Sequence, residues 1–130
     1  MKNAKFIALA LLMLSSAVLA DDKPAQPTRS ILERHDQSGV PGKEIVIGTA
    51  TLPPGATFPY HTHPGDEVGY ILKGSVTGKT KGQPDKVLKA GDSFFNPRGA
   101  EHSVVAGPEG AEIVSSWIVD KGKPMSTLTP

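Results

Sequence analysis

Apolar residues occur in short runs along this chain, and turn-forming residues such as Pro53, Pro54 and Gly55 separate the runs. Beyond the first 20 residues, they never keep a helical period over three turns, so no amphipathic helix is predicted. The pattern predicts nine short strands: Ser30–Arg34, Lys43–Leu52, Thr57–His61, Glu67–Lys73, Ser75–Lys81, Lys86–Lys89, Ser93–Asn96, Ser103–Ala106 and Glu112–Val119. Many short strands favour an all-β fold, an antiparallel sandwich or barrel.

The first 20 residues differ from the rest. Lys2 and Lys5 give a positive start, Phe6–Leu14 is apolar, and Ser15–Ala20 is rich in small residues. This order predicts a secretory signal peptide that is cleaved after Ala20, with an uncleaved N-terminal anchor as the alternative. The apolar run is shorter than the about 20 residues of a membrane span. We therefore expect a periplasmic or secreted protein.

The remaining chain has the size of one domain. Residues 21–29 are polar and proline-rich, which predicts a flexible N-terminal arm. Residues 30–120 hold all nine predicted strands and form the predicted barrel. Residues 121–130 lack apolar periodicity, so we expect a C-terminal surface tail. No internal repeat is visible, so the chain contains one copy of one module.

Charge and cysteine content narrow the choice of partners and metals. Without Lys2 and Lys5, the 14 basic residues become 12 against 13 acidic ones, so the formal charge changes from +1 to −1. There is no basic run with interleaved aromatic residues, so we expect no nucleic-acid partner and no membrane partner after cleavage. The chain has no cysteine, which removes thiolate ligands and favours nitrogen and oxygen ligands for any metal.

Three of the four histidines suggest such a metal site. In a strand, His61 and His63 lie on the same face, about 6.6 Å apart along the backbone. Pro64, Gly65 and Asp66 predict a turn, after which Glu67 opens a returning strand that forms a hairpin beside the histidines. Gly74 allows a tight reversal, and His102 must come from a neighbouring strand. Three imidazoles and a carboxylate suit Fe, Mn, Co, Ni, Cu or Zn better than Ca or Mg.

The spacing of these residues closely resembles the two motifs of the cupin superfamily. The first family motif is Gly, five residues, His-x-His, three or four residues, Glu, six residues, Gly, and it is matched here by Gly55, His61, His63, Glu67 and Gly74. The second is Gly, five residues, Pro-x-Gly, two residues, His, three residues, Asn. Gly91, Pro97, Gly99 and His102 match it, but Ala106 replaces the final Asn. Only residues 75–90 separate the motifs, which resembles the compact single-domain members.

This resemblance implies a fold, a metal site and a partner. The fold would be a single-domain antiparallel barrel, the double-stranded β-helix or jelly roll. One divalent transition metal would be bound by His61, His63, Glu67 and His102, and Glu67 would be a possible base. Cupin barrels commonly pair through edge strands, so a homodimer is expected.

Several other residues are candidates for a substrate pocket. Tyr60, Phe95 and Trp117 are aromatic, and the late strands of cupins often border the cavity, which favours Trp117. For each of them the alternative is a place in the barrel core. Arg98 is a candidate for gripping a carboxylate, and its alternative is an exposed turn residue. Asp66 is expected in a turn.

Two other residues near these motifs are expected to have no role at the metal. His35 precedes a Gly/Pro loop, so we expect it to be solvated. Glu101 is expected to face away from the metal, because neighbouring residues of a strand point to opposite faces.

The leading hypothesis is an exported metalloprotein that binds a small molecule at its metal, with an oxygen-dependent oxidoreductase or dioxygenase as the expected enzyme class. A second hypothesis is a non-catalytic module that binds a metabolite, a sugar or the metal. A third is a cupin isomerase or epimerase that acts by proton transfer without metal. The retained set of four ligands argues against the third hypothesis.

Overall fold

The computed structural model describes residues 25–130, all of which form strands or the connections between them. The strands are β1 (Thr28–Asp36), β2 (Lys43–Leu52), β3 (Thr57–Thr62), β4 (Gly65–Thr80), β5 (Lys86–Lys89), β6 (Ser93–Asn96), β7 (His102–Asp120) and β8 (Thr127–Leu128). The predicted signal peptide, and residues 21–24 of the predicted arm, lie outside the described residues. No helix among residues 25–130 is long and apolar enough to cross a membrane.

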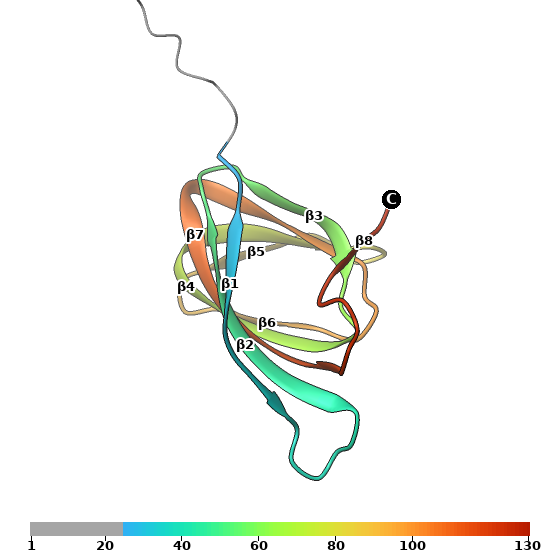
Figure 1. Cartoon of the computed structure of the whole chain (residues 1–130). Helices are drawn as coiled ribbons and strands as arrows, with labels where there is room; N and C mark the ends of the chain where they lie inside the picture. The colour runs from blue at the N-terminus through green and yellow to red at the C-terminus, as the bar shows by residue number, and fades with distance from the viewer. Residues whose placement is uncertain (1–24) are drawn as a thin grey trace, which may run out of the picture.

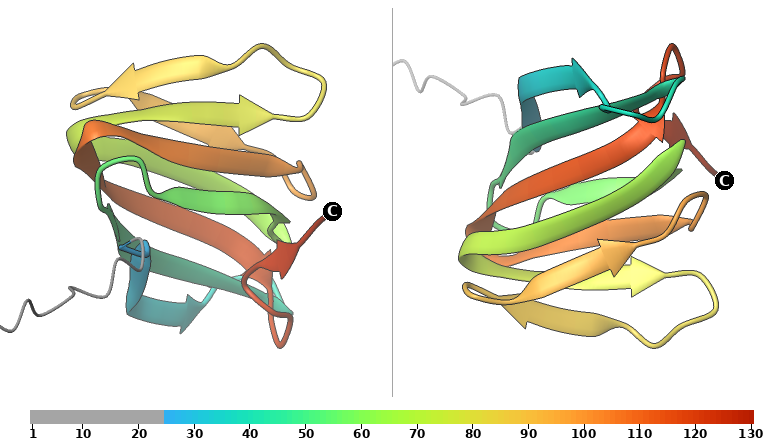
Figure 2. Two further views of the ribbon diagram at one scale, coloured as in Figure 1. Left: turned by 90° about the horizontal axis from the view of Figure 1, so that it is seen from above. Right: turned by 90° about the horizontal axis from the view of Figure 1, so that it is seen from below.

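The strands form two antiparallel layers that share β4 and β7 (Figures 1 and 2). One layer has the order β1–β2–β7–β4–β6 and uses the C-terminal half of β7 with the N-terminal half of β4. The other has the order β8–β3–β7–β4–β5 and uses the opposite halves. Two long strands that pass through both layers close the barrel, so the predicted all-β, antiparallel jelly-roll fold is confirmed.

β4 and β7 each replace two strands of the prediction. Gly74 was expected to reverse the chain between two strands, but β4 continues through it. Its φ is +70°, and a Cβ there would lie 1.9 Å from the carbonyl oxygen of Gly110. The pairing of β4 with β7 shifts register between Gly74 and Val76. The glycine therefore permits an irregularity within one strand, where β4 passes from one layer to the other.

The predicted hairpin of β3 with β4 does not form. β3 pairs with β7 and β8, and β4 pairs with β5, β6 and β7. The expected turn over Pro64, Gly65 and Asp66 is shorter, because β4 begins at Gly65. A Cβ at Gly65 would lie 1.7 Å from the carbonyl oxygen of Ile118, so only glycine lets β4 approach β7 here. The chain crosses between the layers at this point, and β7 joins β3 to β4.

The barrel interior holds two apolar clusters. The larger consists of Leu52, Ile71, Val76, Ala106, Ala111 and Ile113. The smaller consists of Val46, Trp117 and Val119, with Met125 packed against it. Met125 belongs to the predicted tail, which also contains β8 and pairs with β3 through it. The C-terminal segment therefore packs beside the end of β3 where the histidines lie.

Candidate metal centre

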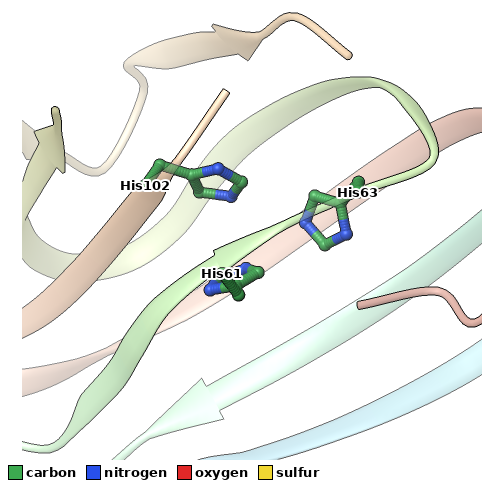
Figure 3. Close-up of side chains that lie close together, drawn as sticks. All are labelled: His61, His63 and His102. Carbon is green, nitrogen blue, oxygen red and sulfur yellow. The ribbon is translucent and has the colours of Figure 1, made fainter. Parts of the chain in front are cut away.

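The three motif histidines lie together inside the barrel (Figure 3). His61 is in β3 and stands directly opposite His102 of β7, and His63 follows the end of β3. The ring centroids are 4.3 Å apart for His61 and His102, 4.9 Å for His61 and His63, and 5.1 Å for His63 and His102. All three side chains are buried. Two neighbouring strands thus bring residues 41 positions apart in the sequence into one cluster.

Backbone carbonyls fix the orientation of each imidazole. The Nδ1 atoms of His61, His63 and His102 bond to the carbonyl oxygens of Pro59 (2.7 Å), Met125 (2.5 Å) and Ala100 (2.9 Å), respectively. A carbonyl oxygen can only accept, so each Nδ1 carries a hydrogen and each neutral ring keeps the lone pair on Nε2. One nitrogen of each ring lies within 4.8 Å of one nitrogen of the other two. Such carbonyl contacts are typical of imidazoles that bind a metal.

Glu67 reaches this cluster from the opposite layer. Its Oε2 lies 3.3 Å from Nε2 of His63 and 3.3 Å from Nε2 of His102, and it accepts a 2.9 Å hydrogen bond from Asn96. With Nδ1 protonated, a neutral imidazole would turn the lone pair of Nε2 toward the carboxylate oxygen. In keeping with this, Nε2 of His63 has no hydrogen-bond partner. Two acceptors this close require a proton or a cation between them. The donor set of three imidazoles and one carboxylate fits a transition metal.

The pKa values of the centre favour its metal-binding form. Burial lowers the pKa of His61 to about 4, and the neighbouring histidines and Arg29 add to this, although the hydrogen bond to Pro59 opposes it. Burial alone would raise the pKa of Glu67, but a proton held between the carboxylate and His102 or His63, together with the hydrogen bond from Asn96, outweighs this and holds the pKa well below its usual range. At neutral pH the centre thus presents an unprotonated His61 and an ionised carboxylate.

A cavity of about 140 Å³ adjoins the centre. His61, Glu67 and His102 form part of its wall, and Trp117, a pocket candidate from the sequence, lines it as well. The Trp117 ring is 2% exposed and lies 5.8 Å from the His63 ring. Phe95 also borders the cavity, but its residue is 58% exposed, and the preceding Phe94 packs against the core instead.

The other two pocket candidates do not line the cavity. Tyr60 lies beneath the ammonium group of Lys81, 5.6 Å from the ring centroid. Arg98 is exposed and forms an ion pair of 2.7 Å with Asp120, because it follows Pro97 in the turn between β6 and β7. Arg98 therefore holds two surface segments together, outside the cavity.

Three residues with expected minor roles are also placed. His35 is exposed and contacts Glu33 at 2.9 Å, away from the cluster. Asp66 is in β4, where its carboxylate accepts a 2.8 Å hydrogen bond from the backbone N–H of Arg98. Glu101 pairs with Lys81 at the surface.

Sequence reasoning missed three residues at this site. Arg29, assigned to the arm, is in β1 and lines the cavity. Asn96 binds Glu67, and its spacing of two from the inward-facing Phe94 in β6 was a usable signal. Met125 supplies a carbonyl to His63 from 62 residues away, and no local pattern announces such a contact.

Known proteins match this chain in sequence and in fold. The family described as "Cupin domain" matches residues 48–117. "Dimethylsulfoniopropionate lyase DddQ" of Ruegeria pomeroyi is 36% identical over 52 residues, which cover 40% of this chain and 26% of that protein. "Germin-like protein 3-5" of Oryza sativa subsp. japonica is 31% identical over 102 residues, 70% of this chain and 45% of that protein. The chain thus spans less than half the length of these curated relatives.

Two solved structures share the fold. The DMSP lyase DddQ from Ruegeria pomeroyi DSS-3 has a TM-score of 0.67 at 23% identity, over 91% of this chain and 59% of that one. An oxalate oxidase in complex with the substrate analogue glycolate has a TM-score of 0.64 at 25% identity, over 84% of this chain and 58% of that one.

Proposed function

Because the chain belongs to the cupin family, we propose that it is a metalloprotein that holds one divalent transition metal through His61, His63, His102 and Glu67. One observation carries the proposal: three buried imidazoles have their Nδ1 atoms bound to carbonyls, which leaves their Nε2 lone pairs for a cation. The contact between the Glu67 carboxylate and two Nε2 atoms supports the fourth ligand. Such ligands favour Fe, Mn, Co, Ni, Cu or Zn.

The role of Glu67 in this proposal is that of a ligand and not of a base. A general base works best when its pKa lies near the working pH. The pKa of Glu67 is held far below that range by its contacts with His102, His63 and Asn96. The carboxylate therefore stays ionised and contributes negative charge to the centre.

We propose that a small molecule binds in the adjoining cavity and is converted there. A bound transition metal would supply Lewis acidity and, if it is redox-active, a site for O2 chemistry. The likeness to an oxalate oxidase supports an oxygen-dependent oxidoreductase. The segment shared with a dimethylsulfoniopropionate lyase supports a lyase as the second candidate. In either reaction, Trp117 and Phe58 exclude water from one side of the cavity and Asn96 keeps the Glu67 carboxylate in place.

Metal content tests the first part. The purified chain should take up one metal ion per molecule from Mn, Fe, Co, Ni, Cu or Zn salts, as measured by inductively coupled plasma mass spectrometry. His61→Ala, His63→Ala and His102→Ala should each abolish stoichiometric uptake, because each removes a nitrogen ligand. His35→Ala is the matched control and should leave uptake unchanged, since His35 is exposed and its side chain pairs with Glu33, away from the three histidines. Similar losses in all four variants would contradict the ligand assignment.

Turnover separates the candidate reactions. O2 consumption by the metal-loaded protein on small organic acids supports the oxidoreductase. Alkene formation from a substrate with a β leaving group, without O2 uptake, supports the lyase. Stoichiometric metal and ligand binding without either reaction would refute an enzyme and leave a metal-dependent binding protein.

We also propose that the protein is exported and forms a homodimer. The leader-like pattern of the first 20 residues supports export, and cell fractionation with N-terminal sequencing of the mature protein tests it. The dimer is supported by exposed apolar residues on the outer face of the β1–β2–β7–β4–β6 layer, namely Ile45, Ile47, Val68, Tyr70 and Ile118. Light scattering should give a molar mass twice that of one chain, and Val68→Lys should reduce the molar mass to that of one chain.

A further inference from the structure

Arg29 is the only residue of β1 that is not exposed, and its side chain lines the cavity with His61 and Glu67. The guanidinium carbon lies 4.9 Å from the ring centroid of Phe58 and 5.4 Å from that of Trp117. Aromatic rings stabilise a guanidinium against its faces, and they leave the N–H groups along its edge free to donate.

Arg29 differs from the other two arginines of the chain. Arg34 forms an ion pair of 2.7 Å with Glu44, and Arg98 forms one with Asp120. None of the ion pairs found among residues 25–130 involves Arg29, and its Nε is buried without a hydrogen-bond partner. Burial lowers the pKa of Arg29, with the charge of Glu67 opposing. A half-buried cation without an ion-pair partner is costly, so a site of this kind suits an anion.

Glu67 does not fill this need. Its Oε2 already accepts a hydrogen bond from Asn96 and faces the Nε2 atoms of His63 and His102. In the proposed function, the negative charge of Glu67 compensates part of the positive charge of the metal. A divalent cation, one carboxylate and one guanidinium then face the cavity, and their net charge is positive.

We propose that Arg29 binds the carboxylate of a small organic acid by two parallel N–H···O bonds, with the rest of the molecule directed to the histidine cluster. This proposal deepens the proposed function. The orientation of the molecule toward the histidine cluster rests on that function, because it assumes a bound metal. A planar fork of donors matches a carboxylate and explains why arginine is found here. A cavity of about 150 Å³ holds a ring of six carbons, so the 140 Å³ available here suits an acid of about six non-hydrogen atoms.

The single tryptophan makes the test direct, because Trp117 lies against Arg29 and its fluorescence reports binding. The probes are butyrate and butyramide, which have the same shape and differ in charge. We expect the metal-loaded protein to bind butyrate at least tenfold more tightly than butyramide. Arg29→Gln should abolish this preference, and Arg29→Lys should retain only part of it, since lysine lacks the fork. Arg34→Gln, on the same strand but paired with Glu44 outside the cavity, should leave it unchanged.

A second arm separates this inference from the metal proposal. The His102→Ala variant should lose the metal and keep a preference for butyrate that depends on Arg29. If the wild type takes up no metal but prefers butyrate through Arg29, the proposed function fails and the carboxylate site stands. Equal binding of the two probes, or an unchanged preference in both folded Arg29 variants, overturns the carboxylate site. Should Arg29→Gln not fold, as judged by circular dichroism, Arg29→Lys alone decides.

Discussion

Replacing Glu67 by glutamine should reduce metal affinity much more than it reduces metal-free stability. Without metal, the ionised carboxylate is buried and its Oε2 faces two imidazole Nε2 atoms at 3.3 Å. Glu67→Gln removes this buried charge and offers an N–H to one Nε2, and such a hydrogen bond contributes about 1 kcal/mol. The charge that is lost was stabilised by the contacts that lower the pKa of Glu67, and the new hydrogen bond offsets part of that loss, so the metal-free variant should be less stable by no more than about 1 kcal/mol.

The effect on metal affinity is larger. The Coulomb attraction between a carboxylate and one unit of positive charge 4 Å away is roughly 4 kcal/mol at an effective dielectric constant of 20. The amide oxygen of glutamine retains part of the ligand interaction, so we expect a net loss of about 3 kcal/mol, or about 100-fold in Kd. Metal titration measures the affinity, and urea unfolding in EDTA measures the stability. Glu112→Gln, an exposed change in β7, is the control. A variant with unchanged affinity, or one that loses as much free energy of unfolding without metal as it loses free energy of metal binding, would refute the reasoning.

Three further predictions concern residues around the centre. Asn96→Ala should weaken metal binding about 10- to 100-fold, because Glu67 loses the hydrogen bond that orients it, and unchanged affinity in a metal titration would contradict this. In metal-free protein, the pKa of His61 is lowered from 6.5 to about 4, so stability should fall as the pH drops through this range, by about 2 kcal/mol after allowance for solvent screening. Urea unfolding at pH 7.0 and 4.5 should show this loss, and an equal loss in His61→Asn would argue against it. Leu52→Ala should cost about 2 to 5 kcal/mol in urea unfolding, without changing metal stoichiometry, since Leu52 belongs to the larger core cluster.

Short-range patterns predicted the strands well where the pairing is regular. β2, β5 and β6 begin and end where the alternation and the flanking turn residues placed them. The breaks predicted at Gly74 inside β4 and between Ala106 and Glu112 inside β7 were wrong, because a glycine can interrupt a strand or lie within one. How closely the neighbouring strand approaches decides whether a glycine ends a strand or lies within one. At Gly107, for example, a Cβ would lie 2.2 Å from the hydroxyl oxygen of Ser75. Such contacts join residues more than 30 positions apart and leave no trace in a local window.

The candidate site also combines residues that local spacing predicts with residues that only long-range contacts bring in. The spacing of His61, His63, Glu67 and His102 is a local property of two segments, and the structure brings these four side chains together. The groups that orient and surround them come from elsewhere. Arg29 lies near the start of the described chain and Met125 near its end, and only closure of the barrel brings them to the histidines.

The proposed function depends most on a metal held by three Nε2 atoms and the Glu67 carboxylate. A crystal of the metal-loaded protein, measured by anomalous scattering at the absorption edge of the bound metal, tests this directly. We predict one strong peak, about 2.0–2.2 Å from Nε2 of His61, His63 and His102 and from an oxygen of Glu67. A peak bound by other residues, or none between the three imidazoles at full metal loading, would contradict it.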